Sequence, residues 1–177
     1  MATQTGALDT APMPMPSRDE EVTAAYADGI RAGLVGAVTI ALWFGVLDVL
    51  WGRPLYTPTV LGTAIFRGGA GLENPATLTP SVEIVLGFTW IHMMAFLLVG
   101  MVAARLLVLA EHDSHLGFGL LLLFFVFEVG FLWACMLFAE PVLQALAWPA
   151  IVVGNVLAAL AMVATLRRHH RDLAIQP

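Results

Sequence analysis

Apolar residues run through four long segments of this chain, without the alternation of apolar and polar positions that marks a half-exposed strand. These segments are residues 32–51, 84–104, 116–138 and 142–166. A helix of about 20 residues crosses the roughly 30 Å of hydrocarbon in a bilayer. Because backbone groups in lipid must find partners within the segment, each one is expected to be helical. The pattern predicts an all-α integral membrane protein with a four-helix transmembrane bundle.

Composition agrees with this class and excludes others. The chain is 59% hydrophobic and 12% charged, against about 25% charged residues in ordinary soluble domains. The net charge of −5 leaves no basic face for nucleic acid. Cys135 is the single cysteine, which excludes an intrachain disulfide and a cysteine-based zinc or iron–sulfur site. The expected surroundings are therefore the lipid bilayer and other membrane subunits, with self-association left open.

The arginines predict the orientation. The loop at residues 52–83, on one side, holds two of them, Arg53 and Arg67. The parts of the chain on the other side hold six: Arg18, Arg31, Arg105, Arg167, Arg168 and Arg171. Basic residues gather on the cytoplasmic side of membrane proteins. Both termini are therefore expected in the cytoplasm of a bacterium, with the long loop outside the inner membrane.

The segments outside the spans also have a predicted arrangement. Residues 1–30 form a polar, proline-rich and then acidic cytoplasmic arm, whose last part, from about residue 20, is expected to continue the first helix. Residues 167–177 form a basic cytoplasmic tail. Within the outer loop, Val60, Leu61, Ala64 and Ile65 have helical spacing but are too few to span a membrane. This short helix is expected to lie flat at the headgroups or to cap the bundle.

Each predicted span carries one hydrogen-bonding side chain at about 12–15 Å from its outer end: Trp43, His92, Glu128 and Asn155. Ionisable groups are costly in hydrocarbon and usually face a partner or a cavity. One interpretation of this polar layer is a clamp between helices, contributing about 0.6–2 kcal/mol per hydrogen bond. The other interpretations are a proton relay, a site for a quinone carbonyl, and a ligand for a cofactor.

Three weaker patterns complete the candidates. Asp48, close to the outer end of the first span, is predicted to form an interfacial ion pair with Arg53. Residues 111–115 contain an H-x-x-H spacing, but we expect a solvated turn, because no convincing third metal ligand accompanies it. Small residues at 29, 33 and 37, and again at 150, 154 and 158, indicate close helix packing.

No catalytic signature occurs in the sequence: a nucleophile elbow, a His-Glu-x-x-His motif, a P-loop and a dinucleotide fingerprint are all missing. The favoured hypothesis is a non-catalytic accessory subunit of a larger inner-membrane complex that handles electrons, quinones or pigments. The alternatives are a small proton or solute carrier that uses Glu128 and His92, and a redox protein with haem or quinone at His92. No particular cofactor and no metal site are predicted.

Overall fold

The computed structural model describes residues 18–74, 77–112 and 148–169. These residues contain four helices: α1 (Arg18–Leu50), α2 (Tyr56–Phe66), α3 (Val82–His112) and α6 (Trp148–His169). The three long helices, over Val22–Leu50, Val82–Leu106 and Trp148–Arg168, are long and apolar enough to cross a membrane. They coincide with the predicted spans at 32–51, 84–104 and 142–166, although residues 142–147 lie outside the described residues. The predicted span at 116–138 also lies outside them.

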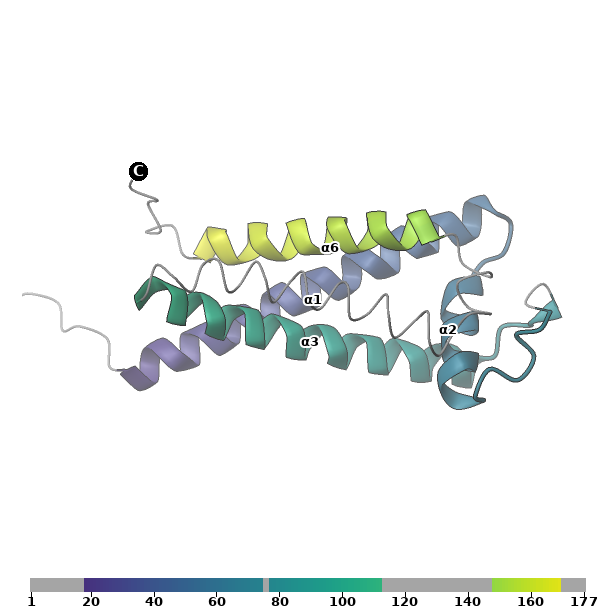
Figure 1. Cartoon of the computed structure of the whole chain (residues 1–177), viewed down its shortest axis with the longest axis horizontal. Helices are drawn as coiled ribbons and strands as arrows, with labels where there is room; N and C mark the ends of the chain where they lie inside the picture. Colours follow the sequence, from purple (N-terminus) through teal and green to yellow (C-terminus); the bar gives the residue numbers. More distant parts are fainter. Residues whose placement is uncertain (1–17, 75–76, 113–147, 170–177) are drawn as a thin grey trace, which may run out of the picture.

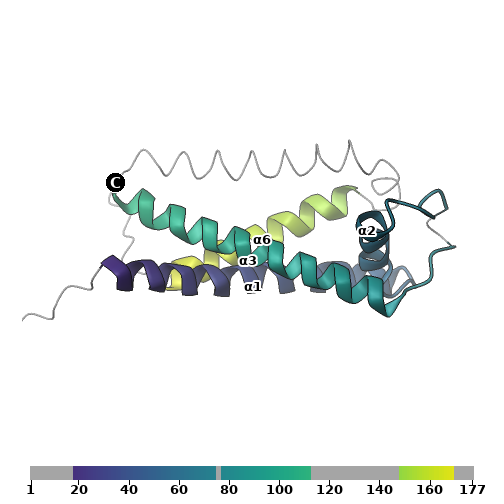
Figure 2. The same cartoon turned by 90° about the horizontal axis from the view of Figure 1, so that it is seen from below.

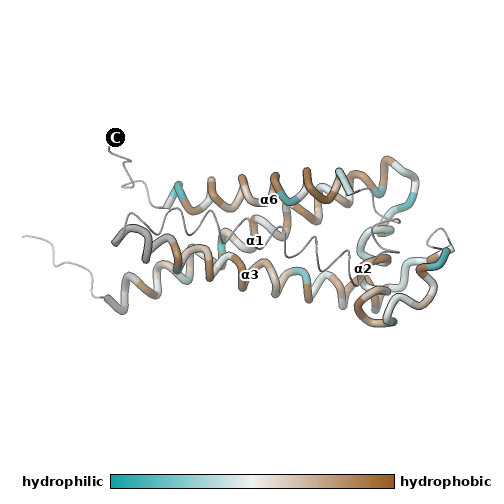
Figure 3. Tube along the Cα trace, viewed as in Figure 1, coloured by the Kyte–Doolittle hydropathy of each residue, from teal (hydrophilic) through white to brown (hydrophobic). Residues whose placement is uncertain are grey.

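The helix α1 occupies the middle of the arrangement and contacts both α3 and α6. Both α3 and α6 run opposite to α1, so the end of α1 and the beginnings of the other two meet at one end of the molecule (Figures 1 and 2). The short helix α2 lies across that end, against the beginning of α3. Figure 3 shows that apolar residues predominate along the three long helices. We refer to the end that carries α2 as the α2 end.

Glycine permits the close crossing of α1 and α3. A Cβ atom on Gly100 of α3 would lie 2.6 Å from the nitrogen and 2.8 Å from the Cα atom of Gly33 on α1. A Cβ atom on Gly29 would lie 2.7 Å from the carbonyl oxygen of Gly100. These distances are too short for any side chain, so the two backbones touch only because all three residues are glycine. The small-residue pattern at 29 and 33 is confirmed as a helix contact.

The contact between α1 and α6 uses small residues in the same way. A Cβ atom on Gly36 would lie 2.7 Å from the sulfur of Met162 on α6. Where the three long helices converge, they bury a cluster without charged groups: Ala32, Ala104, Met162 and Leu166, with Phe96 and Ala103 packed against it. The core of the long helices is therefore small, and most of their apolar surface faces outward.

The helices are longer than the sequence pattern predicts. The helix α1 contains 33 residues, or about 50 Å at 1.5 Å per residue. It begins at Arg18, so the second half of the predicted arm at 1–30 is a continuous extension of the first span, as expected from about residue 20. The helix α3 runs past its predicted end at 104 to His112. The predicted turn at 111–115 therefore begins inside α3, and residues 113–115 lie outside the described residues.

Candidate functional site

His92 joins α3 to α1. Its Nε2 atom lies 3.2 Å from the carbonyl oxygen of Ala37, in the middle of α1. A carbonyl oxygen only accepts hydrogen bonds, so Nε2 must carry the proton and donate it. The ring lies between the rings of Phe88 and Phe96, one turn before and one turn after it along α3. The centroid of the His92 ring is 5.7 Å from that of Phe88 and 4.8 Å from that of Phe96. The nitrogen that a haem iron would most simply bind is therefore engaged with α1.

Trp43 joins α1 to α6. Its indole N–H donates to the carbonyl oxygen of Ala150, in the first turn of α6, at 2.8 Å. Gly154 provides the space for the ring, since a Cβ atom there would lie 2.8 Å from the indole Cδ1 atom. One glycine and one tryptophan thus set the position of α6 along α1.

Two members of the predicted polar layer, His92 and Trp43, contact their neighbours at different levels of α1. His92 bonds to Ala37, and Trp43 lies six residues, or about 9 Å, further along the same helix. Asn155 is half-buried on α6. It lies near the level of Trp43, because the preceding residue, Gly154, packs against the Trp43 indole. Glu128 lies outside the described residues, and its proximity to His92 stays a prediction.

Asp48 holds the connection between α1 and α2. Its carboxylate accepts two hydrogen bonds from Thr57, one from the backbone N–H at 2.8 Å and one from the hydroxyl at 2.7 Å. The side chain is 1% exposed. Thr57 lies in the first turn of α2, where free N–H groups and the helix dipole favour an acidic partner. Leu55, which precedes α2, offers no side-chain cap, so Asp48 performs this role from the neighbouring helix.

Backbone hydrogen bonds at the end of α1 reverse the chain directly after Asp48. The N–H of Arg53 donates to the carbonyl oxygen of Asp48 at 2.8 Å, and the N–H of Gly52 donates to Val49 at 3.0 Å. Gly52 has a φ of +70°. This pair of bonds with a left-handed glycine is the Schellman ending of a helix. The chain therefore reverses immediately after α1 and brings α2 against the carboxylate.

The structure does not bring Asp48 and Arg53 together as the predicted ion pair. The carbon at the centre of the Arg53 guanidinium lies 5.3 Å from the centroid of the Tyr56 ring. The carboxylate of Asp48 is occupied by Thr57 instead. The reversal at Gly52 explains the difference, because it turns the helix start of α2 toward Asp48. Sequence reasoning missed Thr57, although an acidic residue ahead of an uncapped helix start is a usable signal.

The charged and metal-capable groups elsewhere do not form a site within the described ranges. No group of three His, Cys, Asp or Glu side chains that could hold a metal ion occurs in residues 18–74, 77–112 and 148–169. In the same ranges, every buried side-chain nitrogen or oxygen atom has a hydrogen-bond partner. The polar atoms buried in this part of the chain are thus used to hold it together.

Comparisons with family models, with curated proteins and with solved structures give no match for this chain. The functional argument rests on the contacts of its own side chains. Those contacts connect helices: His92 connects α3 to α1, Trp43 connects α1 to α6, and Asp48 connects α1 to α2.

Proposed function

We propose that this chain is a non-catalytic accessory subunit of a larger bacterial inner-membrane complex that handles electrons, quinones or pigments. The observation that carries the proposal is the use of the polar side chains in the described helices. Three of these side chains form a hydrogen bond to a neighbouring helix: Trp43, Asp48 and His92. A transport path or a redox site needs polar groups that meet a solute or a cofactor. These three groups instead do what a structural subunit requires, which is to fix its helices.

The path of the chain supports four crossings. The helix α3 ends and α6 begins at opposite ends of the molecule (Figures 1 and 2). The residues between His112 and Trp148 therefore connect two opposite ends of the molecule. Residues 116–138 within it are apolar and numerous enough to cross about 30 Å of hydrocarbon. We propose this segment as the third of four transmembrane helices.

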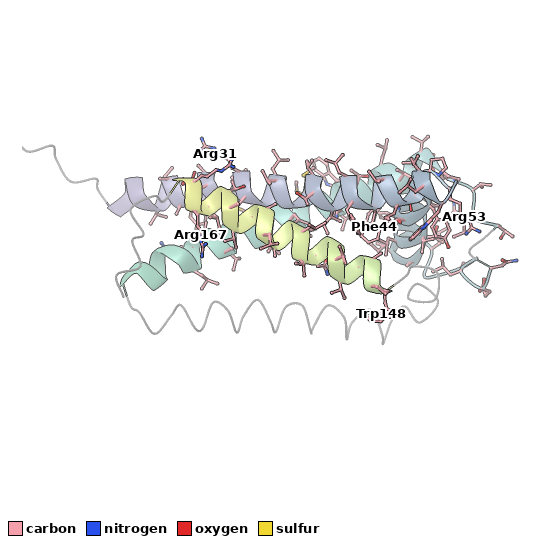
Figure 4. The ribbon with its side chains drawn as sticks, turned by 90° about the horizontal axis from the view of Figure 1, so that it is seen from above. Arg31, Phe44, Arg53, Trp148 and Arg167 are labelled. Atoms are coloured by element: carbon pink, nitrogen blue, oxygen red, sulfur yellow. The ribbon has the colours of Figure 1, made fainter. Side chains whose placement is uncertain are left out.

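The arginines support an orientation with both termini in the cytoplasm. Figure 4 shows Arg31 and Arg167 toward one end of the long helices and Arg53 at the other, the α2 end. Arg31 lies about 28 Å before Leu50 along α1, close to the thickness of the hydrocarbon. By the rule that basic residues stay inside, the α2 end faces outward.

The length of α1 supports a protein partner on the cytoplasmic side. Its residues before Arg31 extend about 20 Å beyond the hydrocarbon. Tyr26 and Ile30, one turn apart on this extension, are both exposed, and a contiguous apolar patch outside lipid marks an interaction site. We propose that the partner complex contacts α1 here.

The test is purification of a tagged copy from its native membrane in mild detergent, with mass spectrometry and an absorption spectrum of the eluate. We expect larger companions in fixed stoichiometry, recovered again when a companion carries the tag, with any chromophore belonging to them. The control is an unrelated tagged membrane protein of similar size. A chain that elutes alone would refute the proposal. If it were coloured, His92 would become a cofactor ligand. If it were colourless, a pH-dependent flux in vesicles, lost in Glu128→Gln, would establish a carrier.

A further inference from the structure

The helix α2 does not present polar side chains outward, as a helix at a water surface would. The helix, Tyr56–Phe66, contains no charged residue. Its hydroxyl groups, from Thr57, Thr59 and Thr63, are buried together with Tyr56 and Val60. Its exposed residues lie in the last turn and are apolar, with Ile65 51% exposed and Phe66 similarly exposed. A helix that faces water presents its charged and polar residues outward. The arrangement indicates that the surroundings of α2 are less polar than water.

The position of α2 places it at the depth of the helix ends. Gly62 packs directly against Ile84 in the first turn of α3. At this level, α1 ends with Leu50 and α3 begins with Val82, and both side chains are 74% exposed. Trp148, at the beginning of α6, is also largely exposed and lies at this end in Figure 4. If the long helices cross a membrane, as proposed above, these apolar side chains face its lipid, and the lipid then reaches the level of α2.

Two cations flank α2. Arg53 precedes the helix and Arg67 follows it, and both side chains are exposed. The ring of Tyr56 lies beneath the guanidinium of Arg53. Among the described residues, the salt bridge is formed in the first half of α1, away from α2, by Arg31 and Asp28 at 3.0 Å. Arg53 and Arg67 are therefore available for an external anion, and a guanidinium matches the oxygens of a phosphate in geometry and charge.

We propose that α2 lies in the outer leaflet at the boundary between acyl chains and headgroups, with Arg53 and Arg67 binding the phosphates of anionic phospholipids. The side of α2 that carries Ile65 faces the acyl chains. The hydrogen bonds from Thr57 to Asp48 belong to this arrangement, because a helix start at this depth has little water to satisfy it. The proposal rests on the membrane crossing of the proposed function, but not on a partner complex.

The depth of α2 is tested by spin labelling in vesicles of phosphatidylcholine and phosphatidylglycerol. A nitroxide is attached to Ile65→Cys in a Cys135→Ala background, and its collisions with oxygen and with a water-soluble nickel chelate are measured. We expect more collisions with oxygen than with nickel. Ala70→Cys, on the exposed loop after α2, serves as the water reference. Leu42→Cys, exposed in the middle of the predicted span at 32–51, reports the membrane crossing itself.

Each outcome of the labelling decides one question. Nickel collisions at Ile65 as frequent as at Ala70 would place α2 in water and overturn the proposal. Protection from both relaxants would show that a second copy covers α2, which also overturns it. Nickel collisions at Leu42 would refute the membrane crossing, a failure that is distinct from a misplaced α2.

The phosphate sites are tested by native mass spectrometry of phosphatidylglycerol bound to the full chain. Arg53→Gln and Arg67→Gln are each expected to lower its affinity about fivefold. Arg31→Gln is the matched control, because Arg31 is paired with Asp28 and lies away from the α2 end in Figure 4. Unchanged binding in the double variant, or an equal loss in the control, would overturn the assignment of these sites.

Discussion

Replacement of Asp48 by alanine is the sharpest test of how the α2 end is held together. The variant removes both acceptors of Thr57, whose side chain is buried. The hydroxyl can rotate to another acceptor, but the backbone N–H in the first turn of α2 cannot. A buried N–H left without a partner costs about 1–3 kcal/mol, and the lost hydroxyl bond costs about 0.5–1.5 kcal/mol. We therefore expect α2 to lose about 1.5–4.5 kcal/mol of local stability, which raises its opening at least about tenfold.

Hydrogen–deuterium exchange followed by mass spectrometry measures this opening in the solubilised protein. Peptides that cover Tyr56–Phe66 are expected to exchange faster in Asp48→Ala, whereas peptides from α6 provide an internal reference. Thr57→Val removes only the hydroxyl bond and is expected to have a smaller effect, about fivefold. Asp48→Asn retains an acceptor oxygen for the N–H of Thr57 and is expected to be the mildest. If Asp48→Ala changed exchange in α2 no more than in α6, the carboxylate would not hold this helix.

Two further substitutions and one spectroscopic measurement test the contacts between the long helices. Gly100→Leu forces α1 and α3 apart and is expected to cost about 1–3 kcal/mol. The thermal midpoint in detergent would show this loss, and an unaltered midpoint relative to the exposed control Leu98→Ala would contradict the close crossing. Trp43→Phe removes the hydrogen bond to α6, so we expect a loss of about 0.6–2 kcal/mol and faster exchange at the beginning of α6; equal exchange would refute that attachment. His92 is expected to carry its proton on Nε2 in a nitrogen NMR spectrum, and a neutral ring protonated on Nδ1 would disprove its bond to α1.

Much of the fold could be predicted from the sequence because the solvent acts on each segment separately. A long apolar run must become a helix in lipid whatever its neighbours are. The three described spans were therefore predicted correctly, and the glycines at 29 and 33 indicated a close helix contact that the structure confirms. The helix ends were less accurate. The helix α3 continues past residue 104, the end of its predicted span, to His112, because polar residues on a helix beyond the lipid give no hydrophobic signal.

The sequence by itself determined that the described part of this chain contains three membrane-length helices, since hydrophobicity and length are properties of each segment alone. The tertiary structure alone decided the partners of the polar side chains. His92 and Trp43 bond to backbone carbonyls, which every residue has and which no sequence pattern distinguishes. Asp48 bonds to Thr57 and not to the nearer Arg53, because the left-handed turn at Gly52 brings α2 back onto the carboxylate. A hydrogen bond depends on where two groups meet in space, and in this protein the packing of the helices sets that position.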